Sequence, residues 1–203
     1  MKKMKKAASM FLALAVVFSL AVPAFAAGGD VTVSVTLQTA DVPEGVYSPA
    51  LNQLTNVRPI AAELSVSVPA GSTVKDAVNA VIGSANIVTC ADCGDKGCVT
   101  GASGGCAHNA AACDCTWKRA ELLDENWQPT GTYASALNGF SYGGQDYFSA
   151  GGSVDLGGGL HRYSGNAWEY YVDGAYQNLY MDQIPVSAAQ EIVLSYNYSS
   201  FIW

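Results

Sequence analysis

Six cysteines, all between Cys90 and Cys115, separate two cysteine-free parts of this 203-residue chain. The segment Cys90–Thr116 contains five glycines and six alanines, and Val99 is its single large aliphatic residue. Such a segment buries too little apolar surface to offset the entropy that is lost when it is ordered. Either covalent or metal bonds therefore hold it or it stays mobile, and any hydrophobic core must come from the residues on either side.

The N-terminus has the order of an export signal. Residues 1–6 include four lysines, residues 7–22 are uncharged and mostly apolar, and Ala24-Phe25-Ala26 supplies the small residues that signal peptidase recognises. We therefore predict a signal peptide over 1–26 and one mature domain over 27–203. That domain is expected to be secreted, with no insertion in the membrane after cleavage.

The cysteines would then meet oxidising conditions, which favour disulfides. Three disulfides would each contribute about 2–4 kcal/mol to local order. A zinc site is the alternative, because Cys90 and Cys93 form a C-x2-C ligand pair, but the second such pair of a zinc ribbon is missing. We predict disulfides and no metal. The cysteines concerned are Cys90, Cys93, Cys98, Cys106, Cys113 and Cys115.

Charge and motifs limit the classes of function. Without residues 1–26, six basic and seventeen acidic residues remain, a net charge of −11. Such a surface repels the phosphates of nucleic acids and anionic lipid headgroups, so neither is an expected partner. Gly101–Gly105 matches the G-x-S-x-G hydrolase pattern around Ser103, but it lies in the cysteine segment without the strand and helix that this motif requires. We therefore predict a protein that is not an enzyme and needs no cofactor.

Alternating apolar residues predict strands in the first part of the mature chain. In Val31–Leu37 and in Leu64–Val68 every second residue is aliphatic, as in strands with one buried face. Prolines and a glycine interrupt residues 41–59, which predicts a loop between these strands.

One helix is predicted over Val74–Ile82. Thr73 can cap it, and Asp76 stands three residues later as the capping-box partner. Strands followed by a helix indicate an α+β domain. The glycines of residues 151–159 are followed by no helix signal, so they predict a flexible loop and no phosphate cradle.

The C-terminal part is rich in aromatic residues. Trp168–Val172 has a strand pattern, Asp173-Gly174 suits a tight hairpin turn, and Ile192–Tyr198 predicts a final strand. Aromatic side chains on such a hairpin suit a flat apolar ligand, a sugar or a peptide, although aromatic residues in strands also pack sheets. We predict that this hairpin binds a ligand through Trp168, Tyr170, Tyr171, Asp173, Gly174 and Tyr176.

Four segments, in this order, resemble the bacterial DUF4430 domain: Val31–Val35, Val68–Ala77, Ala136–Gly139 and Ala167–Gly174. That family is similar to the C-terminal domain of transcobalamin and intrinsic factor. The resemblance implies a small β-grasp-like α+β domain, with residues 90–116 as a cysteine-rich loop insertion and the ligand face beside the aromatic hairpin.

In the eukaryotic relatives that face helps to enclose a corrinoid, so the resemblance implies a secreted ligand-binding module for a corrinoid-like small molecule. The chain departs from the family pattern at residues 188–191, where an Asp/Glu-Gly-Asp turn is usual. We also expect no counterpart of the helical second domain that completes a cobalamin site in those relatives. The alternative is an extracellular surface-structural or adhesion module that binds a glycan or a protein at the cell surface.

Overall fold

A computed structural model describes residues 29–46, 48–89, 98–99 and 115–202. The predicted signal peptide and most of the cysteine segment, including Ser103, lie outside these residues. Of the six cysteines, only Cys98 and Cys115 are described, so the predicted disulfides stay a prediction. No helix in the described part of the chain is long and apolar enough to cross a membrane.

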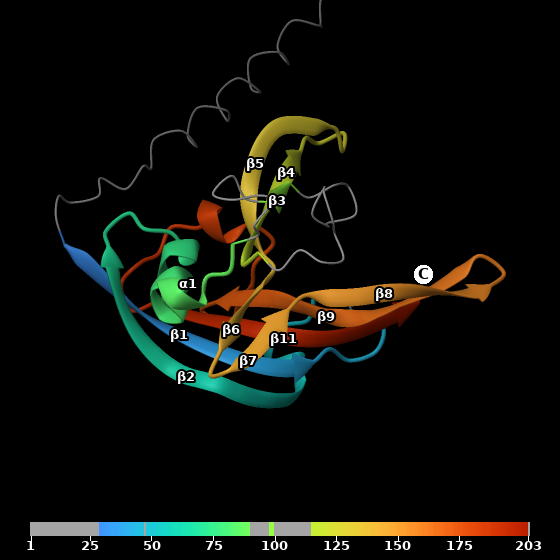
Figure 1. The fold of residues 1–203 in the computed structure, drawn as a ribbon, viewed down its shortest axis with the longest axis horizontal. Coiled ribbons are helices and arrows are strands. Elements are labelled where there is room, and N and C mark those ends of the chain that lie inside the picture. The colour runs from blue at the N-terminus through green and yellow to red at the C-terminus, as the bar shows by residue number, and fades with distance from the viewer. Residues whose placement is uncertain (1–28, 47, 90–97, 100–114, 203) are drawn as a thin grey trace, which may run out of the picture.

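A mixed six-stranded sheet forms the body of the molecule (Figure 1). Its central strands are parallel to each other, and the remaining pairs are antiparallel. The order is β10-β9-β11-β1-β2, with β8 beside β9 at the same edge as β10. The strands are β1 (Asp30–Asp41), β2 (Thr55–Pro69), β8 (Ala150–Gly157), β9 (Leu160–Val172), β10 (Ala175–Tyr176) and β11 (Glu191–Ile202).

The larger core lies between one face of this sheet and the helix α1 (Val74–Ile82). The predicted alternation in β1 is confirmed, because Val33, Val35 and Leu37 are all buried in this core. From α1, Val74, Ala77, Val78 and Ile82 pack against them. Burying a side chain of this size stabilises the fold by about 1.5–3 kcal/mol. The buried face of α1 therefore fixes the position of the helix on the sheet.

The predicted bounds and cap of α1 are confirmed. The Thr73 backbone N–H donates to Asp76 Oδ2 at 2.8 Å, and the Asp76 N–H donates to Thr73 Oγ1 at 3.4 Å. These two bonds satisfy N–H groups that have no partner within the helix. The helix ends at Ile82, and Gly83 follows as its C-cap with a φ of +72° that suits glycine.

A smaller core covers the opposite face of the sheet. Residues that follow β1, with the short 3-10 helix η1 (Leu51–Gln53), fold over Tyr171 and Val193. The predicted loop over 41–59 is wrong at its end, because β2 already begins at Thr55 and contains Pro59. Within the described sheet β2 pairs only with β1, and an edge strand tolerates the missing N–H of a proline.

The glycine-rich residues 151–159 are not a loop, so that prediction is wrong. They form most of β8 and the turn into β9, a hairpin that projects beyond the body in Figure 1. Gly157, Gly158 and Gly159 make the turn with φ values of +83°, +64° and +82°. Tyr163 of β9 covers Gly151 so closely that a Cβ there would lie 2.3 Å from the tyrosine oxygen. A ring from the neighbouring strand thus fills the space that the missing side chain leaves.

Two small sheets complete the fold. One contains β3 (Cys98–Val99), β4 (Trp117–Leu123) and β5 (Pro129–Leu137), and the other contains β6 (Gly139–Tyr142) and β7 (Gln145–Phe148). The 3-10 helices η2 (Ser84–Asn86) and η4 (Met181–Gln183) lie in connections. The described residues are mostly in strands and include one α-helix, which makes this an α+β domain, as predicted.

The two ends of the cysteine segment meet at the body. The Val88 N–H donates to Thr116 Oγ1 and the Thr116 N–H donates to the Val88 carbonyl, both at 2.8 Å. Thr116 is buried, and its carbonyl accepts the N–H of Asn138 at 2.8 Å. The residues at the two ends of the cysteine segment are therefore hydrogen-bonded directly to each other.

Candidate functional site

The predicted aromatic hairpin is formed by β9 and β10. Asp173 and Gly174, with φ values of +50° and +77°, occupy its turn, and both central residues of a type I′ turn need positive φ. The Glu191 N–H donates to Asp173 Oδ1 at 3.0 Å, and the Asp173 N–H donates to the Glu191 carbonyl at 2.8 Å. These bonds fix the turn against the start of β11.

On one face of the hairpin, Trp168 and Tyr170 point into the larger core. The Trp168 ring stacks on Phe140 of β6, with centroids 4.9 Å apart, and its Nε1 donates to the Tyr147 carbonyl at 2.8 Å. Tyr170 is buried and donates its hydroxyl hydrogen to the Leu179 carbonyl. Burial raises the pKa of Tyr170 above its ordinary value. Both side chains thus hold other elements against the sheet.

On the other face, Tyr171 is fully buried and meets Tyr176 edge to face, with centroids 5.8 Å apart. Tyr171 Oη donates to Glu169 Oε2 at 3.2 Å, and Asn197 Nδ2 donates to the same oxygen at 2.7 Å. Burial raises the pKa of Glu169, and these two hydrogen bonds oppose that rise. Burial and the neighbouring Glu169 charge also raise the pKa of Tyr171.

The six predicted ligand residues therefore share one hairpin, but their side chains do not gather on one surface. Asp173 and Gly174 are exposed, Trp168 and Tyr176 are half-buried, and Tyr170 and Tyr171 are buried. That these residues bind a ligand stays a prediction.

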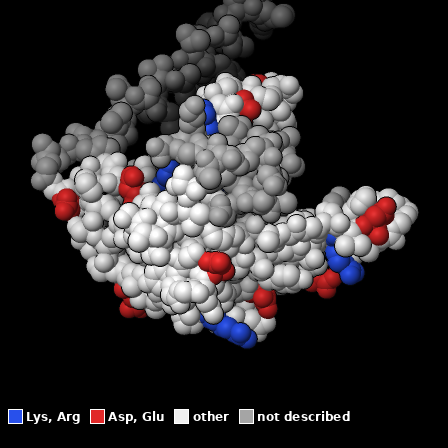
Figure 2. Space-filling view, in the orientation of Figure 1, with Lys and Arg blue, Asp and Glu red and all other residues white. Residues whose placement is uncertain are grey.

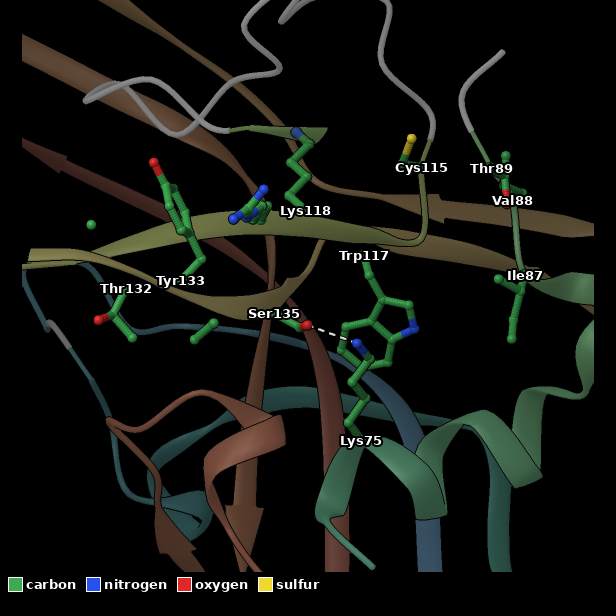
Figure 3. A pocket seen from close by; sticks show the side chains of 13 residues that line it. Lys75, Ile87, Val88, Thr89, Cys115, Trp117, Lys118, Thr132, Tyr133 and Ser135 are labelled. Atoms are coloured by element: carbon green, nitrogen blue, oxygen red, sulfur yellow. Dashed lines mark hydrogen bonds between the residues drawn. The ribbon is translucent and has the colours of Figure 1, made fainter. Parts of the chain in front are cut away.

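A cavity lies elsewhere in the molecule, away from the hairpin of β9 and β10. A cavity of about 670 Å³ lies between α1, the segment Ile87–Thr89 and the hairpin of β4 and β5 (Figure 3). This volume lies within the usual range of about 300–1,000 Å³ for small-molecule sites. Three of the six basic residues in 27–203 line it, namely Lys75, Lys118 and Arg119.

Lys75 connects α1 to the hairpin across this cavity. Its Nζ donates to Ser135 Oγ of β5 at 2.7 Å and lies 5.1 Å from the Trp117 ring centroid (Figure 3). Trp117 Nε1 in turn donates to Asn79 Oδ1 of α1 at 2.8 Å. A cation over an indole ring contributes about 0.5–2 kcal/mol, more where water is excluded. Two residues of α1, Lys75 and Asn79, therefore hold the Trp117 ring, which forms one wall of the cavity.

The strand register gathers aromatic and polar groups on one face of the β4–β5 hairpin. Arg119 pairs with Ser135 and lies two residues from Trp117 on the same face. The Arg119 guanidinium stands 3.9 Å from the Tyr133 ring centroid. Asp182 of η4 reaches the same region, where its Oδ2 accepts the Ser135 N–H at 2.7 Å. Aromatic walls with a few fixed polar groups are typical of a small-molecule site.

One buried oxygen beside this site lacks a partner. Within the described part of the chain, Asp182 Oδ1 accepts no hydrogen bond although its surface is covered. A buried acceptor without a donor costs about 1–3 kcal/mol, so such positions commonly bind water or a ligand group.

The described residues contain no group of three or more His, Cys, Asp and Glu that could hold a metal ion. His161 lies on β9 in the projecting hairpin, whereas the cavity lies beside α1.

Sequence reasoning missed the cavity because its walls come from segments far apart in the chain. Lys75 and Ser135, whose side chains are joined by a hydrogen bond, are 60 residues apart. Trp117-Lys118-Arg119, an aromatic residue beside two cations in a protein poor in cations, is the one local signal that could have pointed to it.

Comparisons with protein-family models, with curated proteins and with solved structures find no match to this chain.

Proposed function

We propose that the protein is a secreted, non-enzymatic module that binds a small molecule in the cavity between α1 and the β4–β5 hairpin. The observation that carries this proposal is the cavity itself, with an aromatic wall held from the helix. A size of about 670 Å³ suits a small molecule better than the flat surface on which most proteins meet.

The resemblance to the DUF4430 family supports the same proposal. In a β-grasp-like domain the first and last strands lie parallel at the centre of the sheet and a helix crosses one face. Here β1 and β11 are parallel neighbours and α1 packs on one face. On this basis we propose a β-grasp-like domain of the DUF4430 kind that carries the cysteine segment as an insertion, and a corrinoid-like molecule as its first candidate ligand.

The cavity shifts the proposed contacts from the hairpin of β9 and β10 to the other side of the larger core. Trp117 of the cavity wall and Trp168 of the hairpin both pack against that core. The hairpin of β9 and β10 would then support the cavity only through the larger core. Trp117, Tyr133 and Lys75 would contact the ligand.

Calorimetric titration of the mature protein with cobalamins and with cobinamide tests this function. We expect heat of binding, together with a change in the corrinoid absorbance. Trp117→Phe should weaken binding, because it removes the indole N–H and part of the wall. Trp127→Phe is the matched control, because Trp127 is 79% exposed on the same hairpin, in the turn between β4 and β5.

No heat and no spectral change at high micromolar corrinoid would exclude this ligand. Retention of the protein by cell-wall fractions, without binding of any small molecule, would overturn the proposal in favour of an adhesion module. Equal affinities of the Trp117→Phe and Trp127→Phe proteins would place the ligand outside the cavity.

A further inference from the structure

The projecting hairpin carries an uncovered apolar surface. We define the arm as β8 with residues 160–166 of β9 and residues 198–202 of β11. Val154 pairs with Arg162, and Arg162 pairs with Ile202, so these three lie in one row on one face. Alternation along β9 adds Leu160 to that face, whereas Leu156 stands at the bulge between Asp155 and Gly157, where the alternation of β8 is interrupted. The apolar side chains of the arm are 60% exposed at Val154, 45% at Leu156, 52% at Leu160 and 48% at Ile202.

This surface continues the face that α1 covers elsewhere. Ile192 and Leu194 of β11 are fully buried under the helix, and by alternation Ile202 points the same way. The helix covers only the part of the sheet near the body (Figure 1). Among the described residues no second layer covers this face of the arm, which carries Arg162 beside its exposed apolar side chains.

The edge of the arm is also open. Within the described residues β8 pairs only with β9, and all eight of its residues are exposed. An unpaired strand edge presents N–H and C=O groups to any extended chain, and proteins usually block such edges with lysine, proline or a bulge in the strand. β8 contains neither lysine nor proline, and its one register shift, between Asp155 and Gly157, lies at its end, so that the edge from Ala150 to Asp155 is regular.

Charge favours a second copy of this chain as the occupant. The mature protein carries a net charge of −11, so two copies repel each other over most of their surfaces. On β8 and residues 160–166 of β9, by contrast, the one carboxylate of Asp155 is balanced by Arg162. Figure 2 shows charges of both signs on the arm. Two copies can therefore meet there without like-charge repulsion.

Gly152 supplies a second argument. A Cβ at Gly151 would strike Tyr163, and the glycines of the turn need positive φ, but a Cβ at Gly152 would meet nothing within 4 Å and its φ is not in the left-handed region. Glycine in a strand costs about 0.5–1 kcal/mol relative to alanine. A single copy thus gives no packing reason for this glycine.

We propose that two copies pair through β8, antiparallel and edge to edge, about a twofold axis at Val154. That register places Val154 opposite the partner's Val154 and Asp155 opposite the partner's Ser153, and it sets the bulge at Leu156 opposite the partner's Gly152. The pairing joins two branched apolar side chains, opposes no like charges and places the bulge where Gly152 leaves space. It also satisfies the open edges of both copies and is closed by twofold symmetry.

Sedimentation velocity of the mature protein over a range of concentrations tests this pairing. We expect a monomer–dimer equilibrium, with slower hydrogen exchange of the β8 backbone amides as the dimer fills. Val154→Lys should raise the dimer dissociation constant by about a hundredfold, because it sets two lysines opposite each other. Leu123→Lys is the matched control, because Leu123 is 49% exposed on β4 and should leave the equilibrium unchanged.

A monomer at every concentration would overturn the proposal and leave the arm to a different partner. A dimer that survives Val154→Lys, or whose β8 amides exchange as fast as in the monomer, would overturn it as well. Circular dichroism of both variants shows whether each has kept its fold, so a loss of the dimer can be attributed to the interface.

Discussion

Gly139 at the start of β6 is a position where one methyl group should be costly. A Cβ on this residue would lie 2.3 Å from the Tyr147 carbonyl oxygen, 2.5 Å from Phe148 Cα and 2.7 Å from Phe148 Cδ1. Two of these atoms belong to the backbone of β7, so no change of side-chain rotamer relieves the clash. Gly139→Ala must therefore move β7 away from β6.

The loss of stability follows from the hydrogen bonds that the carbonyl groups of β7 accept. The Tyr147 carbonyl accepts the Trp168 Nε1 hydrogen at 2.8 Å, and the Phe148 carbonyl accepts the Tyr196 hydroxyl hydrogen at 2.6 Å. Overpacking costs about 1–3 kcal/mol, and each weakened hydrogen bond adds about 0.5–1.5 kcal/mol. We expect Gly139→Ala to lower the free energy of unfolding by about 3 kcal/mol. For a domain of this size that corresponds to a Tm lower by about 6–12 °C.

Differential scanning calorimetry of the mature protein measures this loss, with Gly152→Ala as the control. Because a Cβ at Gly152 meets nothing within 4 Å, alanine there should leave Tm unchanged or raise it slightly in dilute solution. An unchanged Tm for Gly139→Ala would refute the reasoning, because it would mean that β6 and β7 separate freely. Equal losses for the two variants would also refute it, since the effect would then not come from the close approach.

Three further predictions concern the core, a carboxylate and the cysteines. Trp168→Phe keeps an aromatic ring but leaves the Tyr147 carbonyl without its donor, so urea denaturation should show a loss of about 1–3 kcal/mol. Burial raises the pKa of Glu169, so the folded state holds its proton more tightly than the unfolded state, and the stability gained from this proton should disappear as the pH rises through the raised pKa. Glu169→Gln should remove this part of the pH dependence of the urea midpoint, whereas Glu125→Gln in the exposed β4–β5 turn should retain it. Intact mass should increase by about six daltons on reduction if three disulfides join the cysteines of Cys90–Cys115, and bound zinc without this increase would contradict that prediction.

Local sequence patterns were enough to predict the strands, helix and turn that are determined by neighbouring residues in the chain. The alternation in Val31–Leu37 predicts a half-buried strand whichever strands lie beside it. The capping box of Thr73 and Asp76 fixes the start of α1 through bonds between neighbouring residues. Asp173-Gly174 predicts a type I′ turn, because both residues accept positive φ.

The errors arose where a distant residue decides the outcome. Gly151 can lie in a strand because Tyr163 covers it, and Pro59 can lie in β2 because that strand is at the edge. Neither the covering ring nor the position in the sheet can be read from the local sequence. The cavity has the same origin, since Lys75 reaches Ser135 only after the hairpin of β4 and β5 has packed over α1.

The hydrogen bonds between Val88 and Thr116 separate the folding of the sheet from the oxidation of the cysteines. Because the entropic cost of closing a loop grows only slowly with its length, the body is nearly indifferent to how many residues run between these two positions. The six-stranded sheet and α1 can therefore assemble while every thiol is still reduced, whereas exchange of the segment removes β3 from the edge of β4 and Cys115 from the cavity wall. A foreign loop grafted between these two residues should accordingly leave the main sheet in place and alter the cavity.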